Sequence, residues 1–441
     1  MPFFTLETLT PEIQALVMRN IDTVRSLKSL LHASPRLFQV FRTRREYLLT
    51  QVAFNQFHPD IIEDVWTLTK ALQIPRSAPL ADIHDFVNDL SLVDNDYEQH
   101  SMPPSTIIPL CKVGTTIAWF IEDYKRSSLE LLTDLGKYMD LQQDTETLES
   151  DLSIVEKGRL QRAFCRFETC CRLYTVAEGE DATYQHFCQA RRYLRTLLAD
   201  DVEEIACIRD YLVRRLWGVF EAMEDRAVQE DPGSTIRKLG NVCQPHDWFS
   251  RMGKLGHRDY MEYILSQGLG FLREVLESDG LKRAEIVISH STRRTNCISK
   301  ALSDEGDKSS YEISVDYDAG SYDGEGDYIG DGLDNLSQGL VWANDHKVPS
   351  DWGRWPLKGL RDWGYMFWGG RRLQASGVLD QDPRIVAEYL FNERSDRRSV
   401  EDRLSECPWP NNPKSCQNWA NNPLHEFARR PEPENFEEVI D

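Results

Sequence analysis

The clearest pattern of hydrophobic and polar positions lies in residues 6–41, where apolar residues recur at the three- and four-residue spacing of helices. The first helix is expected to begin at Pro11, because Thr10 can cap it and Glu12 places a negative charge in its first turn. One face of this helix carries the apolar residues Ile13, Leu16, Val17 and Ile21. The stretch therefore opens with an amphipathic helix.

Two further short helices are expected in the same stretch. A break at residues 22–23 precedes the first, and Ser34-Pro35 ends it and starts the next, since proline disfavours helix at the residue before it. Their apolar residues are Leu27, Leu30, Leu31, Leu37, Phe38 and Phe41. Three short helices in fewer than about 45 residues bury too little apolar surface to be stable alone. This unit therefore needs a partner, the rest of the chain, or both.

Helical stripes continue through the middle of the chain, and residues 58–280 are expected to form a helical body. Before it, residues 42–56 are expected to continue the third helix without a linker. The body's clearest apolar seam alternates steps of four and three residues along Leu160, Phe164, Phe167, Cys171 and Tyr174. Residues 246–277 are expected to add one helix and residues 284–289 one short strand. No fixed repeat period is present, so a regular solenoid is not expected.

The composition changes in the last third of the chain. Residues 281–340 are expected to form an acidic, Gly/Asp-rich loop or linker, because such a segment buries too little apolar surface to offset the entropy lost on ordering. Residues 341–430 form a Trp-rich segment expected to pack on the body, and residues 431–441 a tail. Five of the 11 tryptophans fall within 27 residues. They form either a local core or a target-binding surface, for which the candidates are Trp352, Trp355, Trp363 and Trp368.

The charge balance restricts the class of partner. The chain has 441 residues, with 51 Lys and Arg against 72 Asp and Glu, and a net charge of −21. This argues against nucleic acid, whose binding needs a concentrated basic surface. Residues 1–60 differ, with seven basic against five acidic residues and so a net charge of +2. A mildly basic N-terminal unit on an acidic body suits an acidic partner surface.

The hydropathy pattern also bears on localisation. No stretch approaches the ~20 uninterrupted apolar residues of a membrane span. The N-terminus lacks the basic and apolar segments of a signal peptide. We therefore expect a cytoplasmic or nuclear protein without membrane association, in which the ten cysteines are reduced.

The sequence contains no constellation typical of catalysis or of a metal site. Cys407 and Cys416 lie nine residues apart with His425 beyond them, and no C-x-x-C pair occurs, so zinc is not expected. The acidic run from Asp316 lacks the glycine and glutamate of an EF-hand at its sixth and twelfth positions. Neither a G-x-S-x-G turn nor a phosphate-binding loop is present. We expect no cofactor, no metal and no enzymatic activity.

The N-terminal stretch resembles an F-box, the short module through which substrate receptors join SCF-type cullin-RING ubiquitin ligases. The F-box pattern opens with Leu-Pro-x-Glu and aliphatic residues, and residues 9–13 read LTPEI, with Thr10 in place of the first proline. The second half matches at Leu27, at the Leu30-Leu31 pair and in residues 33–38 (ASPRLF), although Pro35 departs from the family pattern. With the basic FRTRREYLLTQV that follows, this variant is most similar to F-box-like proteins of filamentous fungi. The resemblance covers about a tenth of the chain.

The resemblance implies that residues 1–57 are a three-helix F-box-like module. Together with the helical stripes and the composition of the rest of the chain, we expect a mainly α fold in which this module is fused to an irregular multi-helix body with a Trp-rich C-terminal segment. The resemblance further implies a substrate receptor that docks to the adaptor subunit of the SCF and cullin complex and presents a target protein. The implied adaptor-binding residues are Leu9, Pro11, Ile13, Leu16, Ile21, Leu27, Leu30, Leu31, Pro35, Leu37 and Phe38.

Two other interpretations stay open at the level of sequence. The F-box-like helices could pack only internally, in a non-enzymatic structural or interaction protein. An enzyme hidden in the helical body is a third alternative, for which no catalytic constellation is visible. The first two interpretations differ in whether the apolar face of residues 9–38 is exposed or covered.

Overall fold

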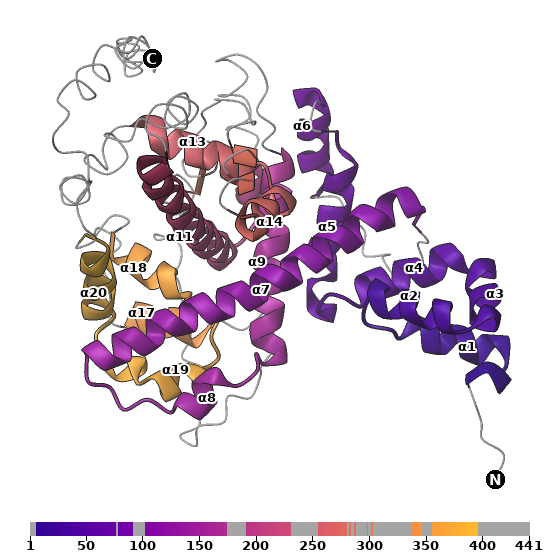
Figure 1. Ribbon diagram of the computed structural model, residues 1–441, viewed down its shortest axis with the longest axis horizontal. Helices are drawn as coiled ribbons and strands as arrows, with labels where there is room; N and C mark the ends of the chain where they lie inside the picture. Colours follow the sequence, from indigo (N-terminus) through magenta and orange to yellow (C-terminus); the bar gives the residue numbers. More distant parts are fainter. Residues whose placement is uncertain are drawn as a thin grey trace.

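The computed structural model describes residues 6–75, 78–90, 102–173, 191–230, 255–279, 337–345 and 355–395, together with a few residues between 282 and 302. These segments consist of helices and short turns, and none of them contains a β-strand. The fold is therefore mainly α, as the sequence predicts. A small N-terminal module projects from one side of a larger helical body (Figure 1).

The N-terminal module comprises η1 (Leu6–Thr8), α1 (Pro11–Arg19), α2 (Val24–Ala33), α3 (Pro35–Thr43) and α4 (Arg45–Phe54). Its helices begin where the sequence places capping residues. Ser34 accepts a hydrogen bond from the N–H of Leu37 at the start of α3, and Thr23 caps α2 in the same way. Pro11 and Pro35 stand at the start of their helices, where the missing N–H costs nothing.

The prediction of one continuous helix through residues 42–56 is wrong. α3 ends at Thr43, and the backbone of Arg44 leaves the helical region with φ −129° and ψ 28° before α4 begins. This break turns α4 back against α1 and α2, both of which it contacts. The small core that results comprises Ala15, Met18, Leu27, Phe41, Leu48 and Val52.

The body is built around α7, which runs diagonally across the view of Figure 1 and contacts α4, α5, α9, α14 and α18. The body helices are η2 (Pro59–Ile61), α5 (Ile62–Gln73), α6 (Leu80–Asp89), α7 (Pro104–Tyr138), α8 (Thr145–Glu149), α9 (Ile154–Leu173), α11 (Ala199–Glu230), α13 (Leu255–Ser266) and α14 (Leu269–Glu277). By length and composition alone α7 could cross a membrane, with 44% of its apolar window buried. Its Ile117, Phe120 and Tyr124 are fully buried in the main core, as in the central helix of a globular protein.

The described part of the C-terminal segment packs on this body. It comprises α17 (Gln338–Asp345), α18 (Trp355–Trp363), α19 (Gly370–Ser376), η5 (Val378–Asp380) and α20 (Pro383–Ser395). α18 contacts α7, α11 and α20, and α19 contacts α8. Polar contacts reinforce the packing, since Glu203 on α11 accepts hydrogen bonds from Arg361 Nη2 at 2.6 Å and from Tyr365 Oη at 3.0 Å.

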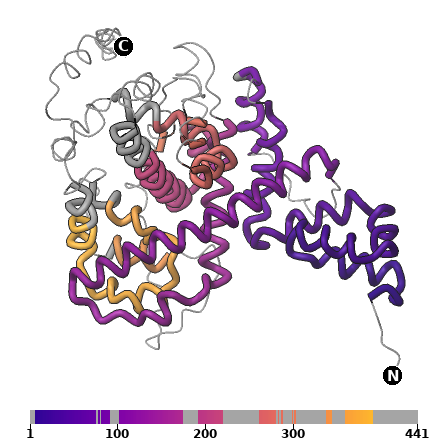
Figure 2. The backbone as a smooth tube through the Cα atoms, viewed as in Figure 1, coloured from indigo at the N-terminus to yellow at the C-terminus, as the bar shows by residue number. Residues whose placement is uncertain are grey.

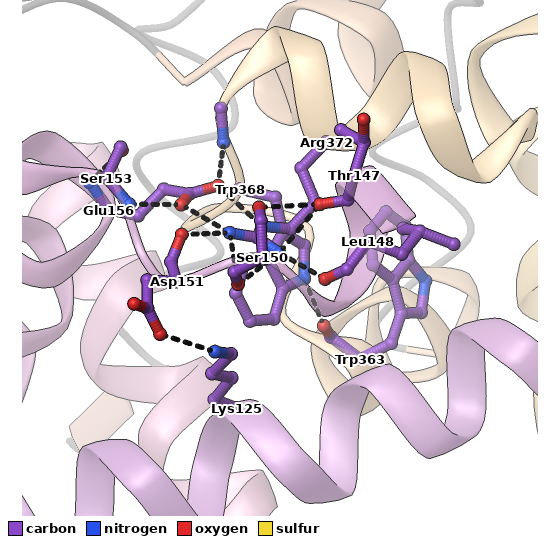
Figure 3. A network of polar contacts seen from close by, with 11 residues as sticks. Lys125, Thr147, Leu148, Ser150, Asp151, Ser153, Glu156, Trp363, Trp368 and Arg372 are labelled. Carbon is purple, nitrogen blue, oxygen red and sulfur yellow. Dashed lines mark hydrogen bonds and ion pairs between the residues drawn. The ribbon is translucent and has the colours of Figure 1, made fainter. Parts of the chain in front are cut away.

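A buried ion pair between Arg372 on α19 and Glu156 on α9 ties the C-terminal segment to the body (Figure 3). Arg372 Nε donates to Glu156 Oε1 at 2.9 Å and Arg372 Nη2 to Oε2 at 3.1 Å, so the pair is bidentate. The guanidinium also donates to backbone carbonyls in and after α8, including those of Leu148 and Asp151. One side chain of α19 therefore holds α8 and the start of α9, which lie more than 200 residues earlier in the chain.

Glu156 also receives backbone donors. The N–H of Ser153 donates to Glu156 Oε2 at 2.8 Å, and the N–H of Glu156 donates to Ser153 Oγ at 3.1 Å, which is a capping box at the start of α9. The N–H of Gly369 donates to Glu156 Oε1 at 3.0 Å. Burial raises the pKa of Glu156, but the hydrogen bonds from Arg372, Gly369 and Ser153 outweigh it and lower the pKa below the usual 4.5.

The stabilisation that Glu156 provides is expected to disappear in acid. Because folding lowers its pKa, this contribution is present above the unfolded value of 4.5 and is lost as the pH falls through the lowered native value. The variant Glu156→Gln lacks the charge at every pH. The difference in free energy of unfolding between wild type and variant, measured by urea denaturation from about pH 7 to about pH 3, should therefore shrink. A difference that stays constant would contradict this linkage.

Two further sequence predictions are wrong. Residues 255–277, the described part of the stretch expected to form one helix, hold two helices, α13 and α14, which are separated at residues 267–268. Ile286 and Val287, expected in a strand, are helical, and Val287 is fully buried in the main core. A lone strand there would leave its backbone N–H and C=O groups unpaired, because no second strand occurs in the described segments. The acidic run of residues 304–334 and the tail lie outside the described residues.

Candidate docking surface

The outer side of α1 presents an apolar stripe to solvent. Ile13 is 45% exposed, Leu16 55% and Val17 39%. Ala15 and Met18, on the opposite side of the helix, are buried in the core of the module. The sequence prediction of one shared face is confirmed for these three residues, and that face is the exposed one. It is wrong for Ile21, which follows the end of α1, is half-buried and packs against the core of the module. Large apolar side chains grouped on a surface are typical of interaction sites.

The neighbouring helix α3 adds an exposed aromatic residue. Its Leu37 and Phe41 are buried, whereas Phe38 between them is 46% exposed. α3 and α1 contact each other, so Phe38 and the stripe lie on neighbouring helices of the module. We refer to Ile13, Leu16, Val17 and Phe38 as the docking surface. In Figure 1 this pair of helices lies at the end of the module that is remote from α18 and α20.

The residues that the F-box resemblance implicates fall into three groups. Exposed residues are Pro11, Ile13, Leu16, Pro35 and Phe38. Half-buried residues are Leu9, Ile21, Leu30 and Leu31. Leu27 and Leu37 are fully buried, so they support the module and present no contact surface. Val17 is exposed, but it is not among the residues that the F-box resemblance implies bind the adaptor. Its position four residues after Ile13 places it on the same helix face, which would have been enough to include it.

Side-chain to backbone hydrogen bonds fix the orientation of α1. At its end, Asn55 Nδ2 donates to the carbonyls of Arg19 at 2.6 Å and of Ile21 at 3.0 Å. At its start, Gln14 Nε2 donates to the carbonyls of Leu6 at 3.1 Å and of Glu7 at 3.2 Å. The Asn55 bonds satisfy carbonyls that the C-terminal end of the helix leaves without intrahelical partners, and the Gln14 bonds tie α1 to the turn that precedes it. The apolar stripe is thus carried on a helix that is held at both ends.

α4 joins the docking surface rigidly to the body, because it contributes to two cores. Its Leu48 and Val52 belong to the core of the module, whereas Ala53 belongs to the main core. α4 also contacts α7, and the N–H of Met102 donates to Thr50 Oγ1 at 3.1 Å. Figure 2 shows the backbone passing from the module into the body along this route. A partner on α1 would therefore be held in a defined orientation relative to the body.

The exposed charges of the module are mainly basic. Arg19, Arg36, Arg42, Arg44 and Arg45 are all exposed. Acidic residues are exposed as well, among them Glu12 in the first turn of α1. The pKa of Glu12 is lowered mainly by a hydrogen bond from its own backbone N–H and then by one from the Thr10 hydroxyl. The charge of Arg44 lowers it to a smaller extent. Glu12 is therefore ionised at neutral pH beside the docking surface.

The tryptophan candidates do not form a described surface. Trp363 and Trp368 are fully buried, and Trp368 Nε1 donates to the carbonyl of Trp363 at 2.7 Å. The core interpretation therefore applies to these two, and neither side chain is available to a target. Trp355 starts α18, but its side chain is outside the described set, as is all of Trp352.

The described residues hold no group of three or more His, Cys, Asp or Glu side chains that could bind a metal ion. Cys407, Cys416 and His425 lie outside these residues. Burial raises the pKa of the Cys165 and Cys207 thiols well above the usual value, which keeps them protonated and poorly nucleophilic.

Comparisons with known proteins add no relative. The chain matches no protein-family model, no curated protein and no solved structure among those with which it was compared. The features of this protein that bear on its function are therefore the docking surface and the F-box-like residue order of residues 9–38.

Proposed function

We propose that this protein is an F-box-like substrate receptor that docks, through the surface on α1 and α3, to the adaptor subunit of an SCF-type cullin-RING ubiquitin ligase. The observation that supports the proposal is the exposure of Ile13, Leu16, Val17 and Phe38 in the one stretch whose residue order resembles an F-box. A helix that packed only internally would turn these residues toward its own core.

Burial of the docking surface would supply part of the free energy of such docking. Fully burying one aliphatic or aromatic side chain contributes roughly 1.5–3 kcal/mol before the cost of association. Since the four residues of the docking surface begin between 39% and 55% exposed, each supplies only part of this amount. Several anchors together, with satisfied hydrogen bonds at the rim, are what a specific interface requires.

The proposed role is positional rather than chemical. A receptor that holds the ligase at one end and a target elsewhere raises the effective concentration of target lysines near the ubiquitin-charged enzyme. The double role of α4 in both cores suits this task, because a rigid connection preserves the distance between the two partners. The chain itself makes and breaks no bonds in this scheme, and it needs no cofactor.

The proposal predicts that Ile13→Asp combined with Leu16→Asp abolishes adaptor binding while leaving the protein folded. Both residues are about half exposed, so charges there are tolerated in the free protein but are costly in an apolar interface. Binding is measured by co-expression and co-purification with the adaptor subunit. Far-UV circular dichroism, which reports the helices, should be nearly unchanged.

A matched control uses Ile154→Asp, which places the same charge on a 74% exposed isoleucine of the body. This variant should bind the adaptor like the wild type. If the wild type fails to co-purify with the adaptor under conditions in which an established F-box protein succeeds, the proposal is refuted. If the double variant loses its helical signal, the internal-packing alternative is favoured instead.

A further inference from the structure

The 441 residues contain two Ser/Thr-Pro dipeptides, Thr10-Pro11 and Ser34-Pro35. Both lie in the N-terminal module, and in both the hydroxyl residue is the N-cap of a helix that begins at the proline. Such dipeptides are the minimal recognition sequence of proline-directed protein kinases. The two hydroxyl groups differ in exposure, because Thr10 is exposed and Ser34 is buried. Only one of the two is therefore a candidate phosphorylation site.

Thr10 is accessible. Its side chain is exposed, and its backbone is extended with φ −67° and ψ 153°. Its hydroxyl makes no capping hydrogen bond to the backbone of α1, and the partner of its side-chain hydrogen bond is the exposed carboxylate of Glu12. Thr10 lies between a short 3-10 turn and the first turn of α1, so it stands at a helix end and not in a helix interior.

Ser34 is inaccessible. It is only 4% exposed. Its Oγ accepts a hydrogen bond from the N–H of Leu37 at 3.3 Å and donates to the carboxylate of Glu7. Phosphorylation would remove the hydroxyl proton that Ser34 donates to Glu7, and it would place a negative charge beside that carboxylate inside the module. Ser34 thus serves as an internal negative control with the same dipeptide and the same N-cap position.

We infer that Thr10 is a phosphorylation site for a proline-directed kinase, and that phosphate on Thr10 weakens docking to the adaptor. In the reaction the γ-phosphoryl group of ATP is transferred to Thr10 Oγ1, the hydroxyl proton passes to the base of the kinase, and ADP leaves. The second part of the inference rests on the proposed function. It assigns a means of regulation to the docking surface.

The expected direction follows from charge and position. The phosphate adds a charge of about −1.5 to −2 three residues before Ile13 and six before Leu16. A partner that covers these residues would have to dehydrate the phosphate or leave a gap in the interface. The exposed carboxylate of Glu12 is close by and adds like charge. At the N-terminus of α1, however, a negative charge stabilises the helix, so the free protein stays folded.

The first experiment maps the site. The full-length chain is incubated with a recombinant proline-directed kinase and ATP, and phosphopeptides are quantified by mass spectrometry. Thr10 should take up phosphate and Ser34 should not, whereas synthetic peptides of residues 6–17 and 29–40 should both be modified. Equal modification of Ser34 and Thr10 in the folded chain would overturn the inference. So would an unmodified Thr10 alongside a modified 6–17 peptide.

The second experiment measures the consequence. Affinity for the purified adaptor is compared by calorimetry for the unmodified chain, the Thr10-phosphorylated chain and Thr10→Val. Phosphorylation should weaken binding by about tenfold or more, and Thr10→Val should bind like wild type but resist the kinase. Equal affinity of the phosphorylated and unmodified chains overturns the regulatory part. If the unmodified chain does not bind at all, the proposed function fails, while the mapping experiment still decides whether Thr10 is a modification site.

Discussion

Replacing Arg372 by methionine is expected to lower the free energy of unfolding by about 3–5 kcal/mol, the usual cost of removing one partner from a buried ion pair. Arg372 and Glu156 are both buried, and the bidentate pair lies where α19 meets the start of α9. Without the guanidinium, the Glu156 carboxylate would stay buried beside two backbone N–H donors only. The backbone carbonyls that Arg372 reaches would lose their donor as well.

The measurement is urea denaturation followed by the fluorescence of the 11 tryptophans, among them the adjacent Trp368, whose ring centroid lies 5.6 Å from Arg372 Cζ. Arg384→Met is the matched control, because Arg384 pairs with Asp382 at the surface and a solvent-exposed pair contributes little. The combination of Arg372→Met with Glu156→Gln should cost less than the sum of the two single changes, since the second change removes the charge that the first leaves unpaired. Additive effects would argue against direct coupling.

Gly364→Ala is expected to destabilise the protein by about 2–5 kcal/mol, from backbone strain and steric overlap together. Gly364 follows the end of α18 with φ 76°, in the left-handed region that disfavours other residues. A Cβ atom there would lie 1.8 Å from Tyr124 Oη. Tyr124 cannot move aside easily, because it is fully buried with its ring 4.7 Å from that of Tyr211.

The control for this variant is Gly377→Ala, which separates strain from overlap. Gly377 has a similar φ of 72°, but the nearest atom to its Cβ would be Leu141 Cβ at 3.3 Å. Its substitution should therefore cost about 1–2 kcal/mol, mainly from the backbone. Thermal unfolding monitored by circular dichroism measures both variants. If the two lose the same stability, overlap with Tyr124 is not the cause at Gly364.

α1 illustrates how far the sequence could predict the candidate site. The spacing of Ile13, Leu16 and Val17 was sufficient to show that they share a face, since side chains three and four residues apart are neighbours on any helix. Whether that face is buried could not be predicted. It depends on Ala15 and Met18 closing the module's core from the other side of the helix, and on α4 turning back against α1.

The Trp-rich segment and the ion pair of Arg372 show the same limit. The spacing of Trp363 and Trp368 did not decide whether they lie in the core or on the surface. Their packing against the body places both in the core. Arg372 and Glu156 are 216 residues apart, so no local pattern joins them. The only local signal was the Ser-x-x-Glu of residues 153–156, which marks a capping box but not its distant partner.

By itself the sequence determined the helical class of this protein, many of the helix starts, and the apolar stripe that resembles an F-box. These features depend on interactions within about four residues, which the residue order specifies directly. Only the tertiary structure decided which stripe is covered, which hydroxyl is accessible, and how the docking surface is attached to the body. Those properties depend on burial, and burial is produced by contacts between segments that lie far apart along the chain.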